Sequence, residues 1–166
     1  MALRRRETRP RREDIRPGRF RRGTTRAGRE DGVFGAEQIA PNFFWTRSYY
    51  TRIADLTDQI VVMTYDTAIP TPSLYRRYVA YVASSITSSV GQSRTRVMVG
   101  VPTYDETGLM HRAGVETPEN ALVGIVVGLR GVGGGGTFEG VALYAGWTTD
   151  DREWAVYERI WRGRRE

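Results

Sequence analysis

The segment Gln59-Ile-Val-Val-Met-Thr-Tyr-Asp66 decides the predicted fold class of this chain. Its four consecutive apolar residues, three of them β-branched, predict a strand that is buried on both faces, as strands of parallel sheets are. Thr64, Tyr65 and Asp66 follow at the carboxyl end of that strand. α/β barrels and open α/β sheets place their chemistry at this end. The segment therefore predicts a parallel sheet with a site at its edge.

Two later segments repeat the pattern of an apolar strand that ends in aromatic or acidic residues. Arg96-Val-Met-Val-Gly-Val-Pro-Thr-Tyr104 precedes Asp105, and Gly140-Val-Ala-Leu-Tyr-Ala-Gly-Trp147 ends in a tryptophan. Residues at helical spacing follow each strand, and this alternation implies right-handed crossovers and a parallel sheet. Three parallel strands alone would leave apolar strands exposed at both edges, which indicates part of a larger architecture.

The predicted elements alternate along the chain from residue 45 onwards. Strands are expected at about 58–65, 96–101 and 140–145, and helices at 45–57, 72–90, 118–130 and 149–162. Helical spacing predicts an apolar stripe on the second helix; its members are Leu74, Tyr78, Tyr81, Val82 and Ile86. The last helix is expected to bury Trp154, Tyr157 and Trp161. Thr117-Pro-Glu-Asn120 supplies a cap, a first-turn proline and an early acid, which together predict a helix start.

The positive charge of the chain is concentrated in its first 30 residues. They carry 12 arginines and four acidic residues, whereas residues 31–166 carry 13 arginines and 15 acidic residues, and the chain has no lysine. We predict a disordered arginine-rich tail over residues 1–35, because it has too few apolar residues to offset ordering entropy. A mis-assigned start or shifted reading frame is the next interpretation, and an arm that binds nucleic acid is the third. The globular domain is expected over residues 36–166.

Composition excludes several classes of protein and leaves the compartment open. The chain has no cysteine, so it has no disulfide framework and no thiolate metal site. No apolar run approaches the roughly 20 residues that span a bilayer, and the N-terminus lacks the apolar core of a signal peptide. No cofactor, metal site or membrane association is predicted, and the localisation is unknown.

Several polar residues have simpler structural interpretations. His111, the sole histidine, lies in a polar loop and is expected on the surface rather than as a base or ligand. Gly133 to Gly136 lacks a following Lys-Ser/Thr pair and precedes a strand, so it is interpreted as a flexible linker. Asp150, Asp151 and Glu153 suit a helix N-terminus. Asp150 and its neighbours are also candidates for the mouth of a pocket.

The three strand ends together resemble glycoside hydrolase family 18, the chitinase-like enzymes. Met63-Thr-Tyr-Asp66 resembles that family's sixth-strand motif, Val97 to Tyr104 is similar to its seventh strand, and Gly140 to Trp147 is similar to its eighth. The resemblance covers about residues 40–162. It implies the C-terminal portion of an eight-stranded (β/α) TIM barrel, of which this chain has room for about three and a half units. The expected fold class is therefore α/β, a partial barrel of about three parallel strands with flanking helices.

The resemblance also implies a chemistry, the substrate-assisted hydrolysis of bonds beside an N-acetylated sugar. In that scheme Tyr65 would hydrogen-bond the acetamide, and Asp66 would bind a sugar hydroxyl or orient the acid. Trp147 would form an apolar floor beneath the sugar, Met63 would pack below the site, and Tyr104 would be a neighbour. Without the resemblance, Tyr65 and Asp66 begin an ordinary loop with Asp66 as a cap, and Trp147 closes a barrel core.

The sequence departs from the family at its catalytic acid. The fourth-strand pattern Asp-x-x-Asp-x-Asp-x-Glu occurs nowhere in these 166 residues. We therefore expect a portion of a hydrolase that acts on N-acetylglucosamine-containing glycans but is inactive alone. A non-catalytic sugar-binding or assembly module, with a homodimer joined through strand edges, is the second hypothesis. Binding of RNA or DNA through residues 1–30 is the third.

Overall fold

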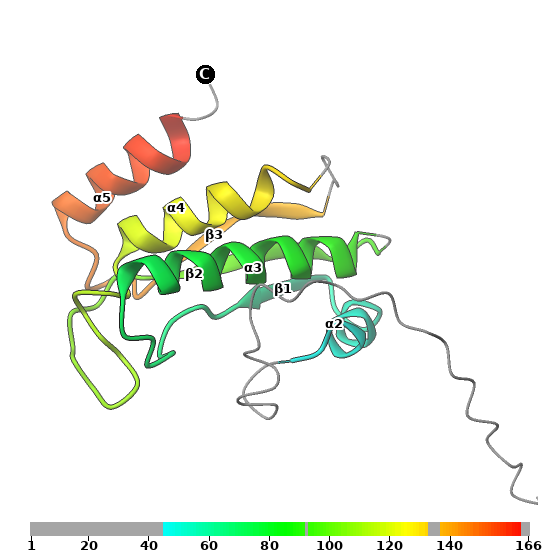
Figure 1. Cartoon of the computed structure of the whole chain (residues 1–166). Helices are drawn as coiled ribbons and strands as arrows, with labels where there is room; N and C mark the ends of the chain where they lie inside the picture. Colours follow the sequence, from blue (N-terminus) through cyan, green and yellow to red (C-terminus); the bar gives the residue numbers. More distant parts are fainter. Residues whose placement is uncertain (1–44, 92, 133–136, 164–166) are drawn as a thin grey trace, which may run out of the picture. The chain divides into compact units, whose positions relative to one another are not determined.

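The computed structural model describes residues 45–91, 93–132 and 137–163 (Figure 1). The elements follow the predicted order: α2 (Arg47–Ala54), β1 (Gln59–Val62), α3 (Pro72–Val90), β2 (Arg96–Pro102), α4 (Pro118–Leu129), β3 (Phe138–Tyr144), α5 (Asp151–Tyr157) and η1 (Glu158–Arg162). The predicted tail at 1–35 and the linker at Gly133 to Gly136 lie outside the described residues. Among the described residues, no helix is long and apolar enough to cross a bilayer.

The sheet has the strand order β1-β2-β3, and both of its pairings are parallel. Met98 of β2 aligns with Val61 of β1 on one side and with Gly140 of β3 on the other. The α/β class and the three parallel strands with flanking helices are therefore confirmed. The described strands form an open sheet, so the closed barrel stays a prediction.

Three helix starts use the capping chemistry that their sequences carry. Thr71 and Thr117 accept hydrogen bonds from the backbone three residues later, and each is followed by a first-turn proline. Asp150 and Glu153 form a reciprocal capping box at the start of α5, in which each side chain accepts from the other's backbone N–H. These interactions fix where each helix begins, and the acidic residues at 150–153 have the helix-start role predicted for them.

The core lies between the sheet and the helices α3, α4 and η1. Val97, Val99 and Val101 of β2 are fully buried, as the middle strand requires. They divide between two clusters of buried side chains, one centred on the α3–α4 pair and η1, the other joining β1 to α2 and the end of α3. Figure 1 shows α3 and α4 lying along the same face of the sheet.

The opposite face of the sheet is partly exposed, which corrects the prediction that the first strand is buried on both faces. Ile60 and Val62 are buried, but Val61 is 48% exposed and Met63 is 58% exposed. The side chains alternate because a strand directs successive residues to opposite faces. The described helices cover one of those faces, so β1 is a one-sided strand.

Helix α3 turns a different stripe inward from the predicted one. Tyr78 and Ile86 are buried as expected, but Leu74, Tyr81 and Val82 are partly exposed. Four further side chains of α3 are equally buried but lie outside the predicted stripe: Tyr75, Val79, Ala83 and Val90. The helix packs on α4 as well as on the sheet, so its buried face is displaced toward α4. In the last helix Trp161 is buried as predicted, whereas Trp154 is 44% exposed and Tyr157 is only partly buried.

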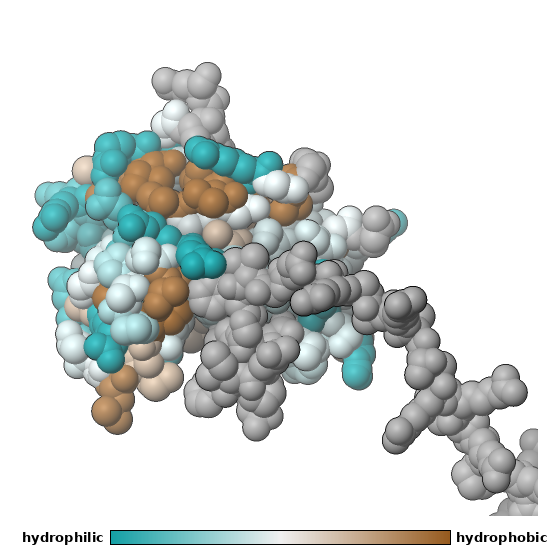
Figure 2. Space-filling model, viewed as in Figure 1, coloured by the Kyte–Doolittle hydropathy of each residue, from teal (hydrophilic) through white to brown (hydrophobic). Residues whose placement is uncertain are grey.

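Helices α3 and α4 approach closely because two glycines of α4 face α3. A Cβ atom built on Gly128 would lie 2.2 Å from the carbonyl oxygen of Ala80, and one on Gly124 would lie 2.7 Å from that of Arg76. The outer side of α4 is also apolar, and Figure 2 shows hydrophobic residues gathered over this helix. Val127 there is 51% exposed.

We predict that Gly128→Ala destabilises the fold, since the new methyl group would force α3 and α4 apart. Overpacking of this kind costs typically about 1–3 kcal/mol of the free energy of unfolding. Urea denaturation followed by circular dichroism measures the change. Gly131→Ala is the control, because a Cβ at Gly131 has no neighbour within 4 Å; equal stability of the two variants would contradict the packing argument.

Candidate functional site

Three tyrosines meet at the carboxyl edge of the sheet, one from each strand end. Tyr65 follows β1, Tyr104 follows β2, and Tyr144 ends β3. The rings of Tyr65 and Tyr144 are stacked, with centroids 5.1 Å apart and planes 6° from parallel, and Tyr104 meets both edge-on at 5.9 Å. Gly100 of β2 permits the stack, because a Cβ there would lie 3.1 Å from the Tyr65 ring.

A hydrogen bond joins two of the predicted site residues. The Tyr104 hydroxyl donates to Asp66 Oδ1 at 2.6 Å, and the Asp66 side chain is 48% exposed. Burial, together with this bond to a carboxylate, raises the pKa of Tyr104 above its usual range. Burial also raises the pKa of Tyr65 to about 12, aided by Tyr144 and Asp66. Both phenols are therefore protonated hydroxyls at neutral pH, able to donate hydrogen bonds.

Trp147 lies at the margin of this group, whereas Met63 lines a different hollow. The Trp147 ring meets Tyr144 edge-on at 6.1 Å, and the Trp147 side chain is 84% exposed. In the described open sheet Trp147 closes no core, and its role in a closed barrel stays a prediction. Met63 is exposed at the end of β1 and lines a groove beside the edge of that strand. The structure thus brings Tyr65, Asp66 and Tyr104 into direct contact and links Trp147 to them through Tyr144.

A buried ion-pairing group lies directly behind Asp66. Glu116 is 1% exposed, and its Oε2 accepts from His111 Nδ1 at 2.8 Å and from the Asp66 N–H at 2.8 Å. His111 is 3% exposed, which corrects its predicted position on the surface. The reason is its carboxylate partner, because a paired histidine can be buried where an isolated polar group cannot. Glu116 has no sequence signal, since its partners lie up to 50 residues away.

Asp66, His111 and Glu116 have the ligand types of a metal site, and their candidate ligand atoms lie within 4.8 Å of one another. The hydrogen bonds argue against this use. Glu116 Oε1 accepts from the backbone N–H and the hydroxyl of Thr67, while Oε2 accepts from Asp66 and His111. A cation would have to displace backbone N–H donors that point at the same oxygens. The cluster therefore holds loops together.

A second hollow, of about 270 Å³, opens beside Tyr104 and the start of α5. Its acidic lining includes Asp105, Asp150 and Glu153. Burial raises the pKa of Glu153, with smaller contributions from the charges of Asp150 and Asp105. The prediction that these acids border a pocket is confirmed for Asp150 and Glu153. Their capping bonds account for their positions without a bound ion.

The chain was compared with protein families, curated proteins and solved structures. No family model matches the chain, no curated protein matches its sequence, and no solved structure matches its fold. The resemblance to the chitinase-like family accordingly rests on the three strand-end motifs. The arrangement of the tyrosines, Asp66 and Trp147 has to be judged by its chemistry.

The raised pKa values of three tyrosines predict how the free energy of unfolding changes at alkaline pH. Burial raises the pKa of Tyr50 and Tyr65 from 10.0 to about 12, and that of Tyr104 further. The folded chain holds these three protons more tightly than the unfolded chain. Titration of the three tyrosines therefore leaves the free energy of unfolding unchanged well below pH 10. It falls as the pH rises from 10 to 12. Urea denaturation across this range measures the slope, and Tyr65→Phe should reduce it; a flat profile would contradict the assignment.

Proposed function

We propose that this chain is a portion of a chitinase-like protein that carries the acetamide-binding side of a glycan site. The observation that carries the proposal is the hydrogen-bonded pair of Asp66 and Tyr104 beside the Tyr65–Tyr144 stack, at the carboxyl edge of a parallel sheet. This edge is where parallel α/β folds bind ligands. N-acetylglucosamine-containing oligosaccharides are the proposed ligands.

The chemistry of the residues suits an N-acetylated sugar. Tyr65 is a neutral hydroxyl that can donate to the acetamide oxygen, and the half-exposed Asp66 can accept from a sugar hydroxyl or orient an acid. Trp147, exposed beside the stack, offers an apolar face to a sugar ring. In substrate-assisted hydrolysis the acetamide oxygen attacks the anomeric carbon and positive charge develops on the acetamido group. The Tyr65 hydroxyl would orient that group, and the Asp66 carboxylate would stabilise the positive charge.

Hydrolysis further needs a group that protonates the leaving oxygen. The acidic pattern that supplies it in the family is absent from this sequence, and loss of a general acid typically costs about 10²–10⁴-fold in rate. We therefore propose binding without turnover for this chain by itself. A partner that supplies the acid would be needed for catalysis.

The full chain should bind tri-N-acetylchitotriose in a calorimetric titration and should not cleave it. Trp147→Ala should weaken binding by about tenfold, the effect of losing roughly 1.4 kcal/mol of aromatic contact. Trp45→Ala is the matched control, because Trp45 is also exposed but lies beside α2 and the β1 edge. Release of shorter sugars by the purified chain would refute the proposed inactivity, and equal affinities of the two variants would refute the role of Trp147.

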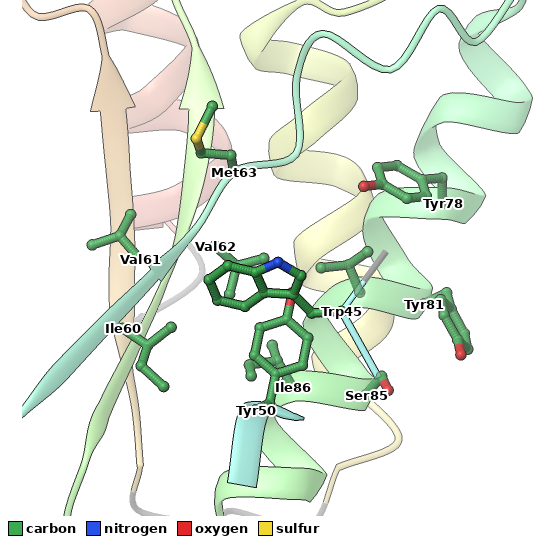
Figure 3. Close-up of a pocket in the computed structure, with 11 residues that line it drawn as sticks. Trp45, Tyr50, Ile60, Val61, Val62, Met63, Tyr78, Tyr81, Ser85 and Ile86 are labelled. Atoms are coloured by element: carbon green, nitrogen blue, oxygen red, sulfur yellow. The ribbon is translucent and has the colours of Figure 1, made fainter. Parts of the chain in front are cut away.

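An assembly role is the second candidate, and the open edge of β1 favours it. Within the described residues no strand pairs with the outer side of β1, and Gln59–Val62 contains no charge or proline that would block edge pairing. A groove of about 300 Å³ follows this edge, lined by side chains of α2, α3 and β1. Figure 3 shows Trp45 and Tyr50 in it, between β1 and α3. A homodimer joined through this edge would pair the exposed backbone groups.

Sedimentation velocity at micromolar concentration should then show a dimer. Val61→Lys should shift the population to monomer, because a charge on a half-exposed edge residue opposes strand pairing. Val127→Lys is the control, since Val127 is similarly exposed on α4, away from the edge. A monomeric wild-type chain would rule out this assembly. Binding to nucleic acid, the third hypothesis, depends on residues 1–30, which lie outside the described residues.

A further inference from the structure

The carboxylate of Glu116 holds the backbone of the loop that follows β1. It accepts from the Asp66 N–H at 2.8 Å, from the Thr67 N–H at 2.9 Å and from the Thr67 hydroxyl. Glu116 belongs to the segment between β2 and α4, so these bonds join two neighbouring loops. Charge-assisted bonds from buried backbone donors are among the stronger hydrogen bonds in proteins.

The loop after β1, which is hydrogen-bonded to Glu116, has a backbone conformation that it would not adopt readily by itself. Asp66 has φ 58° and Ala68 has φ 55°, in the left-handed region that non-glycine residues visit rarely. Ala68 N–H also donates to the Met110 carbonyl at 2.7 Å. The bonds to Glu116 and Met110 thus offset the backbone strain on either side of Thr67. This conformation places the Asp66 carboxylate against the Tyr104 hydroxyl.

His111 links Glu116 to the loop after β2. Its Nδ1 lies 2.8 Å from Glu116 Oε2, its Nε2 lies 3.2 Å from the Tyr104 carbonyl oxygen, and its ring packs 4.1 Å from the Tyr104 ring. Both ring nitrogens therefore face acceptors. A singly protonated ring can donate to one of them, and a doubly protonated ring can donate to both.

We propose that Glu116 and His111 are the positioning residues of the sugar site: they hold Asp66 and Tyr104 in the geometry that receives an N-acetylated sugar. The inference rests on the proposed function. Glu116 fixes Asp66 through its backbone, and His111 fixes Tyr104 through its carbonyl and ring. Neither residue touches the ligand, because both are buried behind the two that do. A misplaced polar group costs affinity even when every contact residue is present.

Glu116→Gln tests the role with an isosteric change. Both carboxylate oxygens of Glu116 accept hydrogen bonds. The glutamine amide would replace one of these oxygens with an NH₂ group, which cannot accept, so at least one donor would lose its acceptor. Binding of tri-N-acetylchitotriose should weaken by about tenfold or more, and hydrogen exchange at the Asp66 and Thr67 amides should accelerate. Glu139→Gln removes the same charge from an exposed side chain paired with Arg96 at the start of β2. It should change neither measurement.

Two further variants separate positioning from stability. Thr67→Val removes one hydroxyl donor to Glu116 while keeping the side-chain shape, so it should also weaken binding. This variant provides the test if Glu116→Gln does not fold. Gly128→Ala lowers the stability of the α3–α4 packing and should leave the affinity of the folded protein unchanged. Affinity lost equally by Gly128→Ala, Glu116→Gln and Thr67→Val would overturn the positioning role.

The titrations also distinguish failure of this role from failure of the proposed function. A wild-type chain that does not bind the trisaccharide at millimolar concentration overturns both. Wild-type binding with equal affinities for Glu116→Gln and Glu139→Gln overturns the positioning role alone. Wild-type binding with a selective loss in Glu116→Gln, and with faster exchange at Asp66 and Thr67, supports it.

Discussion

Parallel pairing through β2 is the constraint on which the rest of the structure depends. Since all three strands run in the same direction, their carboxyl ends meet at one edge, and residues about 40 positions apart become neighbours. Gly100 in the middle strand lets Tyr65 lie across β2 and stack on Tyr144. The aromatic group is therefore a consequence of strand direction and of one residue without a side chain.

The sheet is covered by described helices on one face, and this asymmetry determines both its stability and its exposed surfaces. The valines of β2 that face α3 and α4 are fully buried, whereas Val61 and Met63 remain about half exposed. In a closed barrel the inner face is filled by side chains from opposite strands. The exposed face and the β1 edge, which no strand of the described residues pairs, are consistent with both proposals, a barrel portion and an assembly module.

The elements were predictable because local signals agreed with one another. The Thr117 cap and the acidic residues at 150–153 marked two helix starts, and β-branched runs marked the strands. The cap at Thr71 was recognised only in the structure. The burial pattern was less predictable. Helical spacing predicted an apolar stripe on α3, but the buried face is displaced from it. The displacement follows from the contact with Gly124 and Gly128 of α4, which lie nearly 50 residues beyond their contacts on α3.

For the site, the sequence by itself determined which side chains stand at the strand ends: Tyr65, Asp66, Tyr104 and Trp147 follow from the position of each strand. The tertiary structure decided what holds them. Glu116 and His111 lie in a loop without periodicity, and their role comes from contacts across 5 to 50 residues. A carboxylate is buried only where donors surround it, and in this chain those donors, apart from His111, belong to the loop after β1.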